Sequence, residues 1–536
     1  MKILVTGGSG VVGVGTVTEL LKRGHEVRLL ARHAADDARQ WPGGVTPIVG
    51  DVTDVPSIRG AANGCDAVLH VAGIVEESPP TVTFRRVNVE GTANMVTEAE
   101  RAGVRRFVFV SSLGAPEGES EYHRSKREAE RIVERFAGNW TIFRPGNVYG
   151  PGDGQISVML RLVRGVTPLV PRIGSGDQPF QPIWWEDIAA ALATVVERDD
   201  LAGEALDVAG REVTSQNDLH ARMSRITGRE VQSIPVPEIL ASLSAKAVSM
   251  VGWKIPLGES ELQMIKEGNV IGEGRQNGLE LLGISPTPLD VGLRALAELQ
   301  PEQLPSQGVG SLKRKRYWAD VEGSRHTPES LFALFRTHFD DVTPMFVDAK
   351  AEPRTTDVIS EGETLTLALP MRGHVQVRVA EIEPRDVTLL TLEGHPLAGA
   401  VRFLCEARGD AIRFQVEVYD RPANVIDFIA MRAVGDRLQN HTWSHVVDRM
   451  VEISGGTAPN GWMTGGSCSA SAGSGGISMT LCASTLPFVR SHIHTLAVRS
   501  AVETTTPTNP YGLRGSCAGR SSSTIWCSGP RSISCR

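Results

Sequence analysis

The sequence predicts an α/β fold, in which a doubly wound parallel sheet is followed by a smaller α+β domain. At the N-terminus, the apolar run from Ile3 to Val5 leads directly into three glycines and then into a helical pattern. Short apolar runs then alternate with helical segments, which is typical of right-handed βαβ units. Between residues 365 and 418 the apolar residues instead recur with period two, which is typical of an antiparallel sheet.

The glycines Gly7, Gly10 and Gly13 lie between the first strand and a helix whose apolar residues recur at helical spacing, as Val14, Val17 and Leu21. Because glycine lacks a Cβ, Gly7 can form the tight turn and Gly10 can let the backbone approach a pyrophosphate. Gly13 can pack the helix against the strand, and the helix N-terminus points free N–H groups at the phosphates. The pattern predicts a dinucleotide site, against the alternative of a plain strand-to-helix turn.

Further strands are expected at residues 26–31, 45–49, 67–71 and 106–112, with a helix over 88–102. Arg32 ends the second strand, where NAD-binding sites carry an acidic residue for the ribose hydroxyls. A basic side chain there favours the 2′-phosphate of NADP, with NAD as the alternative cofactor; otherwise Arg32 is a solvated strand-end residue. Asp51 and Val52 follow the third strand and predict part of an adenine pocket.

Tyr122 and Lys126 lie one turn apart on a predicted helix, on the stripe that continues through Ala129, Val133 and Phe136. Both side chains are therefore expected to face the fold, an unusual orientation for a lysine unless a nicotinamide ribose lies beside it. Lys126 would bind the ribose hydroxyls and lower the pKa of Tyr122. Tyr122 would then act as general acid or base on a carbonyl or alcohol, and a serine hydroxyl would polarise the same oxygen.

Six motifs occur in a fixed order: Thr6-Gly-Gly-Ser-Gly-Val-Val-Gly13, His70-Val-Ala-Gly73, Asn88-Val-Glu-Gly-Thr92, Val110-Ser-Ser112, Tyr122-x-x-x-Lys126 and Arg144-Pro-Gly-Asn-Val-Tyr-Gly-Pro151. In this pattern residues 1–299 resemble an extended or atypical short-chain dehydrogenase/reductase of the NAD-dependent epimerase/dehydratase superfamily. The resemblance implies a Rossmann-type sheet with a small substrate lobe, mainly residues 150–299. Residues 140–145 and 181–187 are most similar to the branch that includes the nucleotide-binding accessory subunit of respiratory complex I.

The resemblance implies that Ser112 is the catalytic hydroxyl, with Ser111 behind it, beside Tyr122 and Lys126. It implies that the backbone of Pro145 and Val148 holds the nicotinamide carboxamide, and it implies no metal. The interval from Ser112 to Tyr122 is short for an extended member, which predicts a different substrate-side geometry. The expected cofactor-binding residues are Thr6, Gly7, Ser9, Gly10, Val11, Val12, Gly13, Arg32, Asp51, Val52, Val71, Ala72, Gly73, Lys126, Pro145 and Val148.

The substrate lobe is expected to contain helices near residues 160–163, 188–196 and 215–226. It has no charge cluster that would identify a sugar nucleotide, an acyl-CoA or a quinone, so the substrate class stays open at this point.

Residues 300–311 have the composition of a linker, and residues 312–454 predict the second domain. A helix beginning at Thr327 and Pro328, an antiparallel meander and a last helix resemble the helix-grip fold of START-like ligand-binding proteins, which implies an apolar cavity. His395 either lines that cavity or is a hydrogen-bonded turn histidine. The basic run of residues 313–316 is either a solvated face or a contact for nucleic acid or anionic lipid. Residues 455–536 are rich in Ser, Gly, Thr and Cys without periodicity, and disorder is expected there.

A hydrophobic content of 41% and a net charge of -7 describe a soluble globular protein and argue against nucleic-acid binding. Only Cys65 and Cys405 precede residue 455, and neither a signal peptide nor a membrane span is evident, so a cytoplasmic location is expected. The leading interpretation is an NAD(P)-dependent oxidoreductase acting on a small molecule, with an epimerase or dehydratase as a close variant. The alternative is a non-catalytic NADPH-binding sensor or assembly protein whose second domain binds an apolar ligand.

Overall fold

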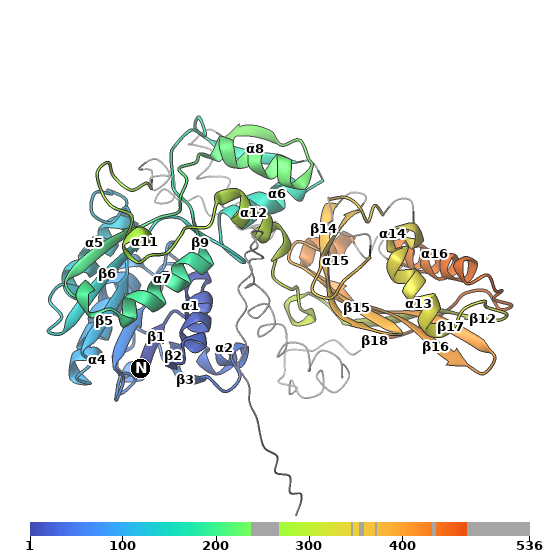
Figure 1. Ribbon diagram of the computed structural model, residues 1–536, viewed down its shortest axis with the longest axis horizontal. Helices are drawn as coiled ribbons and strands as arrows, with labels where there is room; N and C mark the ends of the chain where they lie inside the picture. Colours follow the sequence, from blue (N-terminus) through green and yellow to red (C-terminus); the bar gives the residue numbers. More distant parts are fainter. Residues whose placement is uncertain are drawn as a thin grey trace, which may run out of the picture.

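The computed structural model describes residues 1–166, 168–236, 267, 269–344, 347–352, 358–369, 372–430 and 436–468. Two β-sheets organise these residues, each with its own helices, and Figure 1 shows them side by side along the long axis of the molecule. Helices of the substrate lobe lie between the two sheets. None of the helices in the described ranges combines the length and apolar character that crossing a membrane requires.

The first sheet has seven parallel strands in the order β10-β6-β5-β4-β1-β2-β3, which confirms the predicted doubly wound sheet. The chain starts in the middle of the sheet, so the strand order reverses between β1 and β4. Ligands of such sheets bind at the carboxyl ends of the strands beside this reversal. The strands are β1 (Lys2–Thr6), β2 (Glu26–Ala31), β3 (Val45–Val49), β4 (Ala67–His70), β5 (Arg106–Val110), β6 (Asn139–Pro145) and β10 (Glu204–Val208).

Helices cover both faces of this sheet because the strand residues that point to each face are apolar. Ile3 and Val5 pack in the cluster that contains α1 (Val11–Lys22) and α7 (Trp185–Glu197). Leu4 packs in the opposite cluster with α4 (Gly91–Arg101) and α5 (Glu121–Val133). A π-helical turn, η2 (Arg85–Glu90), precedes α4. Two short helices, α2 (Ala34–Asp37) and α3 (Val55–Ile58), follow β2 and β3.

The substrate lobe has a small core of its own, in which Leu160, Leu219 and Leu293 are buried together. These residues come from α6 (Ile156–Arg164), α8 (Gln216–Thr227) and α12 (Leu289–Glu298). The helices expected near residues 160–163, 188–196 and 215–226 are α6, α7 and α8, but α7 packs on the first sheet instead of in the lobe. The lobe also contains the strand pairs β7 (Val148–Tyr149) with β9 (Ile183–Trp184) and β8 (Leu169–Ile173) with β11 (Gln232–Val236), and the short helix α11 (Gly278–Leu281).

The second sheet is antiparallel and has the order β13-β14-β15-β16-β17-β12-β18. Phe332 and Phe335 on α13 (Pro328–Thr337) and Val447 on α16 (Asp436–Ser454) pack in one core with Phe403 and Phe414 of the sheet. Phe335 contacts the rings of Phe403 and Phe414 at centroid distances of 4.8 and 5.5 Å, so aromatic side chains fill this part of the core. The strands are β12 (Lys313–Val321), β13 (Thr364–Leu369), β14 (Gly373–Glu383), β15 (Asp386–Thr391), β16 (Leu397–Arg408), β17 (Ala411–Pro422) and β18 (Met463–Cys468); α14 (Phe339–Val342) and α15 (Val425–Ala430) are short.

The structure differs from the expected disorder at the start of the tail. Residues 463–468 form β18, which pairs antiparallel with β12. A strand of Met-Thr-Gly-Gly-Ser-Cys has no alternating apolar pattern, and it is held by backbone hydrogen bonds that need no particular side chains. The later residues, 469–536, lie outside the described residues.

His395 is the turn histidine of the two interpretations. Its Nδ1 accepts a hydrogen bond from the backbone N–H of Leu397 at 3.1 Å, and burial lowers its pKa to about 4. The basic run of residues 313–316 lies on β12, where the Arg314 guanidinium pairs with Glu417 at 3.0 Å. The predicted linker packs on the second sheet, because Gln303 N donates to Thr391 O at 2.8 Å.

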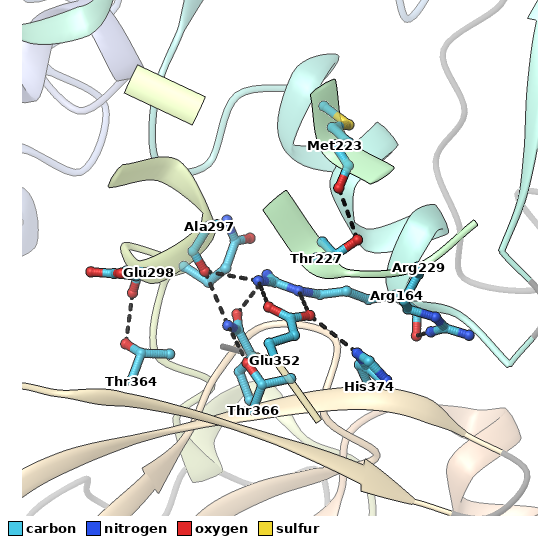
Figure 2. A network of polar contacts seen from close by, with 12 residues as sticks. Arg164, Met223, Thr227, Arg229, Ala297, Glu298, Glu352, Thr364, Thr366 and His374 are labelled. Atoms are coloured by element: carbon cyan, nitrogen blue, oxygen red, sulfur yellow. Dashed lines mark hydrogen bonds and ion pairs between the residues drawn. The ribbon is translucent and has the colours of Figure 1, made fainter. Parts of the chain in front are cut away.

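A buried polar network joins the substrate lobe to the second domain (Figure 2). At its centre Arg164, at the end of α6, forms a bidentate pair with Glu352 at 2.8 and 2.7 Å. Arg164 also donates to Gln376 Oε1 on β14 at 2.8 Å and to Ala297 O on α12 at 3.1 Å. His374 Nδ1 lies 3.2 Å from the Glu352 carboxylate. Since both ions are almost fully buried, at 5% and 10% exposure, the two domains are held in one arrangement by charges that water does not screen.

Candidate active site

The three glycines form the expected turn at the carboxyl end of β1. Gly7 has φ of 70°, and a Cβ there would lie 2.7 Å from the backbone N of Ala72. A Cβ on Gly13 would lie 2.2 Å from Gly7 O, so both positions require glycine for packing. A Cβ on Gly10 would meet only Gly7 O, at 3.7 Å. Gly10 therefore leaves open space at the N-terminus of α1, on the side where a pyrophosphate would bind.

Thr6 and His70 tie this turn to the end of β4. Ala72 N donates to Thr6 Oγ1 at 3.1 Å, and Thr6 Oγ1 lies 2.7 Å from His70 Nδ1. On the other side of the ring, Thr92 Oγ1 lies 3.1 Å from His70 Nε2 and gives its own proton to Asn88 O. The network therefore assigns the ring proton to Nε2, and Nδ1 accepts from Thr6. Burial, with a smaller contribution from Lys126, lowers the His70 pKa to about 3, so the ring is neutral.

The residues expected around the adenosine lie at the carboxyl ends of β2 and β3. Arg32 directly follows β2 and is exposed. The Asp51 carboxylate accepts from the backbone N–H and the hydroxyl of Thr53, both at 2.8 Å. Val52 O accepts from the side-chain amide of Asn94 at 2.9 Å. These bonds fix the loop after β3 beside the strand end that carries Arg32.

Ser111 and Ser112, which the sequence places side by side at the end of β5, have different partners. Ser111 Oγ donates to Glu130 Oε1 at 2.5 Å, and Glu130 also pairs with the Arg144 guanidinium at 2.9 and 2.7 Å. The Ser112 side chain instead lies close to that of Tyr122, whose pKa it lowers against the effect of burial. Because the Ser111 hydroxyl is engaged in the ion pair behind it, Ser112 is the serine available beside Tyr122.

Tyr122 and Lys126 both face inward from α5, as expected, and are 9% and 4% exposed. Burial raises the pKa of Tyr122 to about 12, and the Ser112 side chain opposes the rise. Burial lowers the pKa of Lys126 to about 8, with Glu130 opposing. Lys126 Nζ donates to Val110 O at 2.9 Å and lies 2.9 Å from where a Cβ on Gly73 would be.

The electrostatic expectation for Tyr122 therefore differs from the structure. The spacing predicts that Lys126 lowers the Tyr122 pKa, whereas here desolvation dominates and Ser112 is the group that opposes it. The Lys126 ammonium is instead directed to the end of β5 and over the Phe109 ring, 5.1 Å from its centroid. At neutral pH Tyr122 is thus a protonated phenol, which can donate a proton.

Part of the chain is similar in sequence to known proteins. Residues 3–209 match the model of the NAD dependent epimerase/dehydratase family. The match covers the chain from β1 to the end of β10. The chain is 35% identical over 180 residues to a 3-beta-hydroxysteroid dehydrogenase of Mycolicibacterium neoaurum, a match covering 28% of this chain and 49% of that protein. It is 28% identical over 237 residues to the ceramide reductase of Caulobacter vibrioides, covering 44% and 74%.

The chain thus spans about half the length of the steroid dehydrogenase that it matches. Among solved structures, an NADPH-dependent quinone oxidoreductase of Escherichia coli complexed with NADPH is similar, with a TM-score of 0.46 and 20% identity. That likeness covers 55% of this chain and 99% of the other.

Asn88 lies in the part of the chain that matches the family model, and its role was not predicted from the sequence. Its side-chain amide donates to Ser125 Oγ at 3.0 Å and to Ile74 O at 3.1 Å, while its Oδ1 accepts from Ile74 N at 2.9 Å. Ser125 in turn donates to Tyr122 O at 2.7 Å. Asn88 therefore joins the segment after Gly73 to α5. In the sequence, only its position in the motif Asn88-Val-Glu-Gly-Thr92 could have indicated this role; the structure places it in the π-helical turn η2.

Pro145 and Val148 lie where β6 ends and the short strand β7 begins. Pro145 O accepts from Leu113 N at 2.9 Å, and Val148 begins the short strand β7, which pairs with β9. A pocket of about 630 Å³ lies beyond this loop in the substrate lobe, with Gln181, Arg211, Arg275 and Asn277 among its polar lining residues. Arg275 pairs with Asp207 at 2.9 Å. Within the described residues, no cluster of His, Cys, Asp and Glu could hold a metal ion.

Proposed function

We propose that the chain is an NAD(P)-dependent oxidoreductase in which Tyr122 is the general acid or base on a carbonyl or alcohol, with Ser112 and Lys126 assisting. The observation that carries the proposal is that Ser112, Tyr122 and Lys126 are all buried beyond the glycine turn at the carboxyl edge of the sheet, where Lys126 Nζ donates to Val110 O. The residues around the turn fit a dinucleotide, because Gly10 alone of the three glycines faces open space. A bound nicotinamide cofactor would supply the hydride acceptor or donor.

In the direction of reduction, the Tyr122 phenol would donate its proton to the carbonyl oxygen, and the Ser112 hydroxyl would donate a second hydrogen bond to the same oxygen. A phenol with a pKa of about 12 holds its proton at neutral pH, which supports the role of acid in the resting protein. Lys126 would exchange its bond to Val110 O for the ribose hydroxyls, and its ammonium would then favour the phenolate left after proton transfer.

Arg32 supports NADP as the preferred cofactor, since an exposed guanidinium at the end of β2 can pair with a 2′-phosphate. The names of the two relatives describe reactions on apolar lipids, a steroid and a ceramide. We therefore include steroid ketones and long-chain ketones among the first substrates to test. An epimerase or dehydratase would use the same three side chains within one catalytic cycle.

The test follows the loss of NADPH absorbance with a panel of carbonyl compounds, for the parent protein and for Tyr122→Phe. The phenylalanine ring preserves packing, so stability and NADPH binding should be retained while turnover falls by about 10²–10⁴-fold. Equal rates for Tyr122→Phe and the parent on any substrate that is turned over would refute the assignment.

The alternative function, an NADPH-binding sensor or assembly protein, is favoured by one observation: the second domain is fixed to the substrate lobe through Arg164 and Glu352. In that function the cofactor would set the arrangement of the two domains. The complex I branch and the START-like assignment belong to this proposal. They are supported by the similarity of residues 140–145 and 181–187 and by the antiparallel sheet with α16 packed on it.

A further inference from the structure

A carboxylate of the substrate lobe binds the start of the catalytic helix. Glu267 Oε1 accepts hydrogen bonds from the backbone N–H groups of Glu119 and Ser120, at 2.9 and 2.7 Å. Its other oxygen, Oε2, lies 2.6 Å from Nδ1 of His123. Glu119 and Ser120 lie three and two residues before Tyr122, and His123 directly follows it, although Glu267 is 144 residues away from His123 in the sequence. One carboxylate thus makes three contacts with the segment that carries the proposed catalytic tyrosine.

His123 is the centre around which the loop between Ser112 and the helix is built. A Cβ on Gly114 would lie 2.5 Å from the His123 ring, and one on Gly118 would lie 2.3 Å from it, so the loop backbone packs directly on the ring. Only glycine permits this approach. The loop is closed by bonds of Ala115 N to Ser112 O at 2.9 Å and of Gly118 N to Gly114 O at 2.8 Å.

The contacts also determine the state of the His123 ring. An ionised carboxylate can only accept, so Nδ1 carries the proton that is shared with Glu267. Burial lowers the His123 pKa, with Glu267 opposing, and the ring side chain is only 3% exposed. The His123 ring centroid lies 5.2 Å from that of Tyr122.

We propose that Glu267 and His123 are positioning residues. They hold the loop after Ser112 and the helix that carries Tyr122 in a fixed position relative to each other. The proposal rests on the proposed function for its catalytic meaning and deepens it. The short interval between Ser112 and Tyr122 is thereby spanned by a loop folded on His123. The substrate lobe, through Glu267, then determines where the two hydroxyls lie. Neither residue contacts the reacting atoms, and both act through Ser112 and Tyr122.

The test compares Glu267→Gln with Glu273→Gln, an exposed glutamate of the same lobe, as the matched control. A glutamine can still accept from the Glu119 and Ser120 amides, but its NH₂ group faces Nδ1 and requires a lone pair there. The His123 ring should therefore change from the Nδ1–H to the Nε2–H tautomer, which ¹⁵N spectra of the ring distinguish. In protein labelled at the tyrosine Cζ, the Tyr122 resonance, assigned with Tyr122→Phe, should shift in Glu267→Gln only.

With any substrate that the parent protein turns over, Glu267→Gln should lower kcat by about 10- to 100-fold and leave the KM for NADPH unchanged, as expected for misplaced catalytic groups. An unshifted Tyr122 resonance in Glu267→Gln, or a kcat equal to that of the parent, would overturn the proposal. If the parent protein turns over nothing while the Tyr122 resonance still shifts, the proposed function fails and the positioning role stands.

Discussion

The buried pair Arg164–Glu352 is the point at which the attachment of the second domain can be tested most directly. Glu352→Gln keeps the shape of the side chain and removes its charge, which leaves the Arg164 guanidinium buried without a counter-ion. Breaking a buried ion pair in this way costs about 3–5 kcal/mol. We therefore expect a large loss of stability from one atom replacement far from the catalytic groups.

The lowered pKa of Glu352 gives a second value for the contribution of this carboxylate to the free energy of unfolding. Burial opposes ionisation, but the hydrogen bonds from His374 and Arg164 outweigh it and lower the pKa from 4.5 to about 2. At about 1.36 kcal/mol per pKa unit, this corresponds to about 3 kcal/mol. Because the folded-state pKa is lowered, this stabilisation is present above pH of about 4.5 and is lost as the pH falls toward 2.

The assay is denaturant unfolding of the full chain at pH 7 and at pH 4 and below, with Glu393→Gln as the control. Glu393 pairs with Arg161 at 2.8 Å between the same two domains, but its side chain is 44% exposed. Loss of such an exposed pair costs about 0–1 kcal/mol. The difference between parent and Glu352→Gln should shrink in acid, because the parent alone loses the Glu352 contribution. Equal stabilities of the Glu352→Gln and Glu393→Gln proteins at pH 7 would refute the reasoning.

Three further outcomes are expected. Arg32→Asp should reverse a preference for NADPH over NADH, since the charge-assisted pair contributes about 1.5–3 kcal/mol; equal affinities of the parent for both would contradict it. Gly10→Ala should weaken NADPH binding without lowering the melting temperature, whereas Gly13→Ala should lower the melting temperature because its Cβ would lie 2.2 Å from a backbone oxygen. Truncation after Cys468 should leave thermal stability unchanged, whereas truncation after Ser454 should reduce it by removing β18 from the edge of β12; identical melting temperatures for the two truncations would show that β18 contributes nothing.

The periodic elements could be predicted from the sequence because their burial repeats along the chain. The strand at residues 45–49 agrees to the residue with β3, and the inward stripe of Tyr122 and Lys126 is the buried face of α5. Period two likewise identified β13, β14, β16 and β17. The strand β18 was not predicted, because Gly465 and Gly466 interrupt any alternation of apolar and polar residues. Their backbone nevertheless pairs with β12 in regular antiparallel register.

The electrostatics could be predicted only in part, because a pKa depends on burial as well as on neighbours. The spacing places Lys126 one turn from Tyr122. It does not show that burial raises the pKa of the Tyr122 phenol, or that the Lys126 ammonium donates to Val110 O. The family resemblance favours Ser112 over Ser111, but the sequence does not show which partner each hydroxyl has. Glu130, 19 residues from Ser111, separates their roles by occupying one hydroxyl.

No repeating pattern of residues in the sequence predicts the contacts that connect the lobe, α5 and the second domain. Glu267 reaches His123 across 144 residues, and Glu352 reaches Arg164 across 188. In both cases one acidic side chain accepts hydrogen bonds from several groups on an element far away in the sequence. A carboxylate bound in this way determines how two folded elements pack against each other. It contributes little to the formation of either element by itself. Substitutions at Glu267 and Glu352 should therefore change how α5 and the second domain are placed against the lobe, while each sheet keeps its own core. Removing the side chain of Phe335 or Val5 should instead disrupt the core of one sheet.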